Sequence, residues 1–116
     1  MSTGARFKLV FFCPAVATQS VLEHLFATDP QHLGKIGNYS HCAFLSRGTG
    51  QFRPEDGAQP AIGTPGTLEY VDEDRVEILV TTTDGNHHEL QKALKILKAA
   101  HPYEEVAYDV YRLEDF

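Results

Sequence analysis

The segment that most constrains the fold of this chain is the apolar run at residues 6–13, RFKLVFFC. Its aromatic and branched side chains are typical of a β-strand. Successive residues of a strand point to opposite faces, so Phe7, Leu9 and Phe11 share one face while Val10 and Phe12 share the other. Because both faces are apolar, we expect this strand to lie inside a sheet and to be covered on both sides.

Two helices are predicted from apolar residues at helical spacing. Pro14 opens the first, which runs to about residue 27. The second follows Asn86, a plausible N-cap. The two core stripes are Val21, Leu22, Leu25 and Phe26 in the first helix and Leu90, Ala93, Leu94 and Leu97 in the second.

Further strands are predicted at residues 40–47 and 106–113. Residues 67–71 and 75–83 are also β-like, and the acidic triplet between them leaves two interpretations, a hairpin or one bent strand. The resulting order is strand, helix, strand, long loop, strand, helix, strand. This order predicts an α+β fold, the ferredoxin-like β-α-β-β-α-β sandwich.

The long loop at residues 48–66, GTGQFRPEDGAQPAIGTPG, is the least regular part of the chain. Its glycines permit backbone geometries closed to other residues, and its prolines stiffen the path. Nineteen residues without periodicity exceed a normal connection and favour a functional loop. A hydrophilic linker is the alternative, although Phe52 and Ile62 fit a loop that folds onto something.

Length and charge narrow the class of protein. The 116 residues predict one domain with a short polar tail at residues 1–5. A net charge of −6 without a basic cluster argues against nucleic-acid binding. No apolar run approaches transmembrane length. Residues 6–17 resemble a signal peptide, but Pro14 interrupts the apolar run and the domain needs this strand. We therefore predict a cytoplasmic protein. In that compartment Cys13 and Cys42 are expected to be reduced and buried.

Four ordered motifs resemble a known module: GKIGNYSHCAF, the GTGQFRP…GA-x-P-x-IG loop, EYVDEDRVE, and the terminal HPYEE-x-AYDVYxL. Together they are similar to the insert domain of NIF-three-like (YqfO-type) proteins, also found as a free-standing small protein, over residues 7–113. The resemblance implies a fold like that of CutA and PII proteins, assembled as a homotrimer. Larger family members carry a two-metal centre in a separate domain that this sequence does not contain, so GTP cyclohydrolase activity is not implied here.

A homotrimer also agrees with the residues themselves. Two helices cover only one face of a two-layer sandwich, yet residues 6–13 are apolar on both faces. Self-association would bury the second face favourably. The competing explanation is that the long loop covers this face within one copy.

The predicted topology places the end of the first strand, the long loop and the turn at His101 at one edge of the sheet. In PII-like proteins, ligands lie between subunits at the base of the corresponding loop. Arg53 would hold an anionic group and glycine amides would approach it. The candidate ligand-binding residues are Gly48, Gly50, Phe52, Arg53, His101, Glu104 and Glu105.

Three classes of function remain open. In the first, the module binds a small ligand or a divalent transition metal, the latter through His101 and Glu105. In the second, the module is structural, and a carboxylate paired with Arg53 or Arg112 would be its signature. The third is an enzyme using His101 as acid or base, or a metal-dependent hydrolase, which the absence of known catalytic motifs disfavours. His87 and His88 diverge on a helix, and His41 lies at the far end of its strand from His101.

Overall fold

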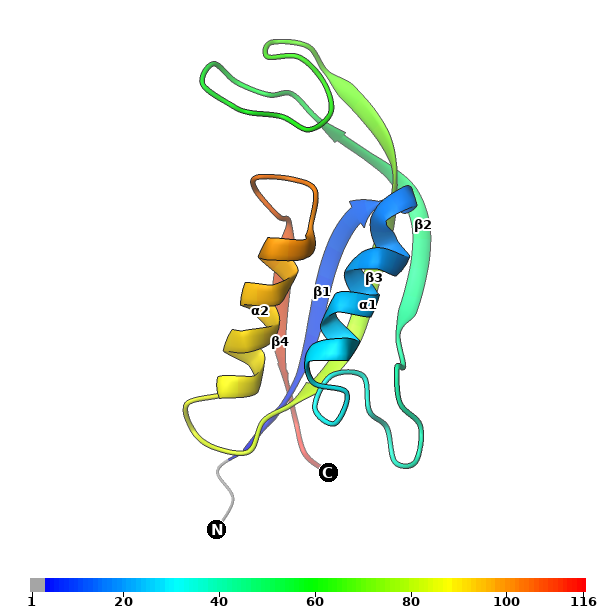
Figure 1. The fold of residues 1–116 in the computed structure, drawn as a ribbon, viewed down its shortest axis with the longest axis vertical. Coiled ribbons are helices and arrows are strands. Elements are labelled where there is room, and N and C mark those ends of the chain that lie inside the picture. The colour runs from blue at the N-terminus through cyan, green and yellow to red at the C-terminus, as the bar shows by residue number, and fades with distance from the viewer. Residues whose placement is uncertain (1–3) are drawn as a thin grey trace.

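Strand β1 (Arg6–Pro14) lies inside the sheet, as its two apolar faces predict. The computed structural model describes residues 4–116 and contains one antiparallel sheet in the order β2-β3-β1-β4, with β2 at Phe44–Phe52, β3 at Glu69–Thr81 and β4 at Tyr108–Leu113 (Figure 1). Helices α1 (Thr18–Thr28) and α2 (His88–Ala100) complete the predicted ferredoxin-like α+β order.

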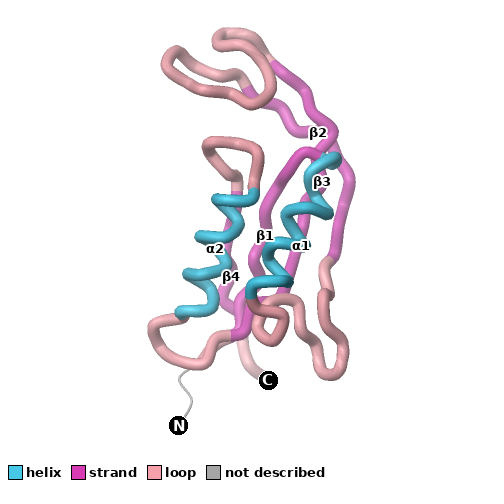
Figure 2. Tube along the Cα trace, in the orientation of Figure 1, coloured by secondary structure: helices cyan, strands magenta, loops and turns pink. Residues whose placement is uncertain are grey.

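Both helices cover the same face of the sheet (Figure 2). Phe7, Leu9 and Phe11 of β1 are buried against them, together with the α1 and α2 core stripes. The first helix starts later than predicted, because Pro14 ends β1 and a short 3₁₀ turn (Ala15–Ala17) precedes α1. None of the helices within residues 4–116 is long and apolar enough to cross a membrane.

Strand β3 settles the choice left open by the sequence: residues 69–81 form one continuous strand and not a hairpin. Its acidic triplet lies within the paired region. Glu73 pairs with Gly48 on one side and with Pro14 on the other, and Asp74 pairs with Arg47 and Cys13. These two acids therefore point to opposite faces of the sheet.

Strand β2 corrects the prediction for residues 40–47. It begins at Phe44 and continues to Phe52, because β3 offers pairing partners as far as Glu69. The first five residues of the predicted loop, 48–52, are thus strand, and the loop itself spans residues 53–68. Together β2 and β3 form a long ribbon that bends beyond the body of the sheet (Figure 1).

Two terminal features also differ from the predictions. Asn86 does not cap α2; His87 takes that position with φ 54°, and the Asp84 carboxylate accepts the amides of Asn86 and His87. The predicted tail includes Ala5, which is buried and exchanges hydrogen bonds with Thr82. Residues 1–3 of that tail lie outside the described residues.

The second face of the sheet carries no helix (Figure 2). Phe44 and Tyr111 on this face are 65% and 51% exposed, whereas Val10 between them is buried. The long loop does not cover it, because residues 53–68 lie beyond the strand ends (Figure 1). This face therefore leaves two aromatic rings open to solvent, beside Lys8, Glu77 and Asp109 on the same face.

Candidate functional site

The long loop and the turn that follows α2 meet at one end of the sheet, as the topology predicts (Figure 1). Strands β1 and β2 end here, and β3 and β4 begin here. The Gln59 backbone N–H donates a 2.7 Å hydrogen bond to Glu104 Oε1. The rings of Phe52 and Tyr103 lie 5.8 Å apart between centroids. A polar contact from the loop and an aromatic contact from the last residue of β2 therefore hold this end of the ribbon on the turn.

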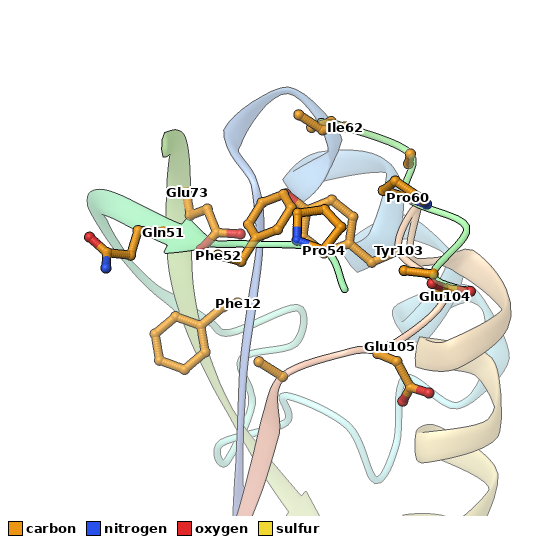
Figure 3. A pocket seen from close by; sticks show the side chains of 13 residues that line it. Phe12, Gln51, Phe52, Pro54, Pro60, Ile62, Glu73, Tyr103, Glu104 and Glu105 are labelled. Carbon is orange, nitrogen blue, oxygen red and sulfur yellow. The ribbon is translucent and has the colours of Figure 1, made fainter. Parts of the chain in front are cut away.

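A cavity of about 290 Å³ lies between these two segments (Figure 3). We call it the rim pocket. Three aromatic rings, three carboxylates and a set of small apolar side chains form its walls. The lining residues are Phe12, Gln51, Phe52, Pro54, Ala58, Pro60, Ala61, Ile62, Glu73, Tyr103, Glu104, Glu105 and Ala107.

Tyr103 is the most unusual polar residue of the rim pocket. Its hydroxyl is shielded from solvent and has no hydrogen-bond partner among the described residues. Burial, with a further contribution from the Glu73 carboxylate, raises the pKa of Tyr103 to about 12. The hydroxyl is therefore neutral at physiological pH. A buried polar group without a partner is costly, which makes it a candidate contact for a ligand.

Glu73 lies half-buried on the pocket side of β3. Its carboxylate points toward the rings of Phe52 and Tyr103 (Figure 3). A Cβ at Gly50 would lie 1.9 Å from Glu73 Oε1, so the carboxylate occupies space that only glycine leaves free. The Glu73 carboxylate raises the pKa of Tyr103 both by its charge and as a nearby hydrogen-bond acceptor, although the pair lies outside strict hydrogen-bond geometry.

His101 has a structural role in this conformation. Its Nδ1 accepts the Tyr103 backbone N–H at 3.0 Å, which leaves Nε2 as the protonated nitrogen that donates to the Phe12 carbonyl at 2.7 Å. Burial lowers the pKa of His101, so the neutral ring is favoured. The side chain therefore joins the end of α2 to the end of β1.

The predicted site residues are only partly brought together. Phe52, Glu104 and Glu105 line the rim pocket. Four others do not: Gly48 pairs with Glu73 in the sheet, Gly50 accommodates the Glu73 carboxylate, His101 is engaged with backbone groups, and Arg53 is exposed.

Two of the chemical expectations are not met by the geometry of this conformation. The lining contains no arginine, lysine or histidine, so Arg53 does not create an anion site in the rim pocket. Both ring nitrogens of His101 are already bonded, so it is not free to bind a metal with Glu105 in this conformation. Across residues 4–116 the structure contains no group of three or more His, Cys, Asp or Glu side chains suited to a metal.

Neither arginine named as a signature of a structural role pairs with a carboxylate in the described part of the chain. Arg112 instead lies over the Phe7 ring at 5.6 Å.

His41 belongs to the connection between α1 and β2, at the opposite end of the molecule from the turn after α2 (Figure 1). It contacts Phe26, with ring centroids 4.9 Å apart.

Sequence reasoning missed Phe12, Glu73 and Tyr103 as pocket residues. Phe12 is adjacent to the predicted end of the first strand, and Tyr103 lies inside the HPYEE motif, so both were near a predicted feature. Glu73 was placed between two candidate strands. Only the continuity of β3 brings it opposite Gly48, and no local pattern revealed that pairing.

A second polar network lies on the helix side of the sheet. Asp74 is buried and accepts hydrogen bonds from Thr18 Oγ1 at 2.6 Å and Arg47 Nε at 2.7 Å. Because Thr18 donates to Asp74, the Cys13 thiol donates to Thr18 Oγ1 at 3.2 Å. Arg47 and Thr18 lower the pKa of Asp74, and burial raises that of the Cys13 thiol. Every polar side chain of this network has a partner.

Comparison with known proteins agrees with the fold and the motifs. No protein-family model matches the chain. The GTP cyclohydrolase 1 type 2 homolog of Halalkalibacterium halodurans is 44% identical over 112 residues, covering 97% of this chain and 28% of that protein. Its counterpart in Mycobacterium tuberculosis is 42% identical over 106 residues, covering 91% of this chain and 26% of that protein. A Bacillus cereus protein related to NIF3 superposes with a TM-score of 0.74 at 38% identity, over 99% of this chain and 28% of that structure.

The chain is a NIF3-like domain. It spans about a quarter of the length of the curated relatives it matches. Its fold is also that of CutA1 from Pyrococcus horikoshii, with a TM-score of 0.62 over 95% of this chain and 85% of that structure at 14% identity. The NIF3-like and CutA-like assignments made from the sequence motifs are therefore confirmed.

Proposed function

We propose that this NIF3-like chain is a cytoplasmic, CutA-like homotrimeric module that binds a small molecule or ion at its subunit edges. The observation that carries the proposal is the rim pocket, which exists because residues 53–68 fold back onto the turn after α2. Apolar walls with a few polar groups, one of them an unpartnered hydroxyl, are typical of a ligand site.

The oligomeric part of the proposal is supported by the open face of the sheet. Phe44 and Tyr111 are exposed there, and a second copy would remove these two rings from water. Light scattering coupled to size exclusion tests it. Tyr111→Asp is expected to convert a trimer to a monomer, whereas Tyr39→Asp, at an exposed tyrosine outside the sheet, is expected to leave the trimer intact. A wild-type monomer in dilute solution would contradict the proposal.

The ligand part is tested by native mass spectrometry of protein taken directly from cells, which reports copy number and bound species together. A retained small species that is lost on Phe52→Ala would support a ligand role. A metal role through His101 would require the imidazole to release Phe12 or Tyr103. It predicts a zinc-induced or copper-induced rise in Tm that His101→Ala abolishes.

A purely structural module is the second candidate, and the bonding of His101 favours it. Both ring nitrogens tie backbone segments together, which is what a folding turn requires. Trimeric protein without retained species or ligand-induced stabilisation would select this role. The name GTP cyclohydrolase 1 type 2 homolog belongs to proteins of which this chain spans 26–28%, and we do not extend that activity to it.

A further inference from the structure

The ionisable groups lining the rim pocket are all acidic. Glu73, Glu104 and Glu105 contribute carboxylates, and Tyr103 contributes a hydroxyl that stays neutral because its pKa is about 12. With no cationic side chain among the lining residues, an anionic ligand would meet repulsion and no counter-ion. The charge of the walls therefore selects against phosphates and carboxylates.

The three carboxylates are not equivalent. Glu104 already accepts the Gln59 amide at 2.7 Å and holds the loop. Glu105 is exposed to solvent, which weakens any charge pairing there. Glu73 is half-buried, is accommodated by Gly50, and has the Tyr103 hydroxyl near it as a polar neighbour, outside strict hydrogen-bond geometry. It is the carboxylate best placed to pair with a ligand.

The remaining walls are suited to the body of such a ligand. The rings of Phe12, Phe52 and Tyr103 line the cavity, and aromatic faces attract cations. Proline, alanine and isoleucine side chains supply the rest of the apolar surface. A volume of about 290 Å³ is at the small end for ligand pockets, which suits a metabolite-sized molecule.

We propose that the rim pocket binds a small primary amine with an apolar body, its ammonium group paired with Glu73 and hydrogen-bonded to the Tyr103 hydroxyl. This inference rests on the proposed function, whose ligand class it specifies. The ammonium donates one N–H to the Glu73 carboxylate and another to the Tyr103 hydroxyl oxygen, while the apolar body packs against Phe12 and Phe52. It also explains why the pocket retains an unpartnered hydroxyl beside a carboxylate.

The test compares three probes of nearly the same shape by titration calorimetry on the full chain: phenethylamine, the neutral 2-phenylethanol and the anionic 3-phenylpropionate. We expect phenethylamine to bind at least about tenfold more tightly than the alcohol, since only the amine gains a charge pair with the partly buried Glu73. The anion is expected not to bind.

Variants identify the groups responsible. Glu73→Gln keeps the size of the side chain and removes its charge, so it should weaken phenethylamine at least about tenfold and leave the alcohol unchanged. Asp56→Asn removes a charge from the exposed part of the same loop and should have no effect. Phe52→Leu, which keeps apolar bulk without a ring, should weaken the amine and the alcohol to a similar extent, because Phe52 packs against the phenyl group that the two probes share.

The outcomes separate this inference from the proposed function. Preference for 3-phenylpropionate, or amine binding that Glu73→Gln does not change, would overturn the amine assignment while leaving a ligand pocket. No binding of any probe would also overturn it. If trimeric protein from cells nevertheless retains another small species, the proposed function stands without this ligand class.

Discussion

Glu73 and Asp74 are consecutive residues of β3, yet they meet opposite environments on the two faces of the sheet. Asp74 is buried on the helix side and accepts hydrogen bonds from Thr18 and Arg47. Glu73 lies at the rim pocket near the Tyr103 hydroxyl, and the pair falls outside strict hydrogen-bond geometry. A satisfied buried network stabilises a fold, whereas unsatisfied groups at a cavity leave bonding capacity for a ligand. On this account Asp74 contributes to the stability of the fold, whereas Glu73 is available to bind a ligand.

The sharpest test of this contrast is Asp74→Ala, for which we expect the largest loss of stability. Removing the carboxylate leaves the buried Thr18 Oγ1 without its acceptor and the exposed Arg47 without its ion pair. We expect a loss of about 2–3 kcal/mol in the free energy of unfolding, measured by urea denaturation. Phenethylamine affinity at the rim pocket should be unchanged at temperatures where the variant is folded. A loss below about 0.5 kcal/mol would mean that this network does not stabilise the fold.

His101→Ala should have the next largest effect on stability. It leaves the Phe12 carbonyl and the Tyr103 amide without partners, and we expect a loss of about 1–3 kcal/mol. Because the folded pKa of His101 is lowered from 6.5, its stabilising contribution is complete above about pH 6.5 and is lost as the pH falls through the folded value. The wild type should therefore lose more stability than His101→Ala on acidification below pH 6.5. Parallel pH profiles for the two proteins would contradict this role.

Glu73→Gln should change stability little, because no hydrogen bond is lost. It should instead lower the pKa of Tyr103 from about 12 without returning it to 10, since burial is the larger cause of the shift. Ultraviolet titration of tyrosine ionisation, with Tyr103→Phe to assign the signal, measures this change. Gly50→Ala should act in the same direction by displacing the Glu73 carboxylate. An unchanged Tyr103 pKa in Glu73→Gln would place the carboxylate away from the hydroxyl.

The smallest expected effect is that of Glu104→Gln. The amide oxygen still accepts the Gln59 N–H but without the charge, so we expect a stability change below about 1 kcal/mol. Hydrogen exchange at the Gln59 amide should speed up several-fold. Glu105→Gln is the matched control, because Glu105 lines the same pocket and forms no hydrogen bond to the loop. Equal exchange rates in both variants would mean that Glu104 does not anchor the loop.

The fold was largely predictable because its signals are local. The two-sided apolar pattern of residues 6–13 gave an interior strand, and the stripes at Val21–Phe26 and Leu90–Leu97 gave the helices. Boundaries that depend on pairing were not predictable. Residues 48–52 look like loop because of their glycines, yet β3 recruits them into β2.

The candidate site was predictable in position but not in chemistry. Chain direction alone placed the long loop beside the HPYEE turn, and Phe52, Glu104 and Glu105 indeed line the cavity. Arg53 was expected to define an anion site, but a side chain at the base of a loop has no sequence signal for its orientation, and it is exposed. Glu73 and Tyr103 gain their importance from burial and from the lack of partners, which only three-dimensional packing determines.

The docking of the end of β2 and the following loop, residues 52–68, on the turn after α2 is the basis of the rim pocket, and a ring-to-ring nuclear Overhauser effect combined with amide exchange at Gln59 tests it most directly. With Phe52 and Tyr103 selectively labelled, centroids 5.8 Å apart place ring protons near enough for a cross-peak in solution. We predict that cross-peak together with slow exchange of the Gln59 amide. Absence of the cross-peak with rapid exchange at Gln59 would show the loop detached from the turn, and the rim pocket would not exist.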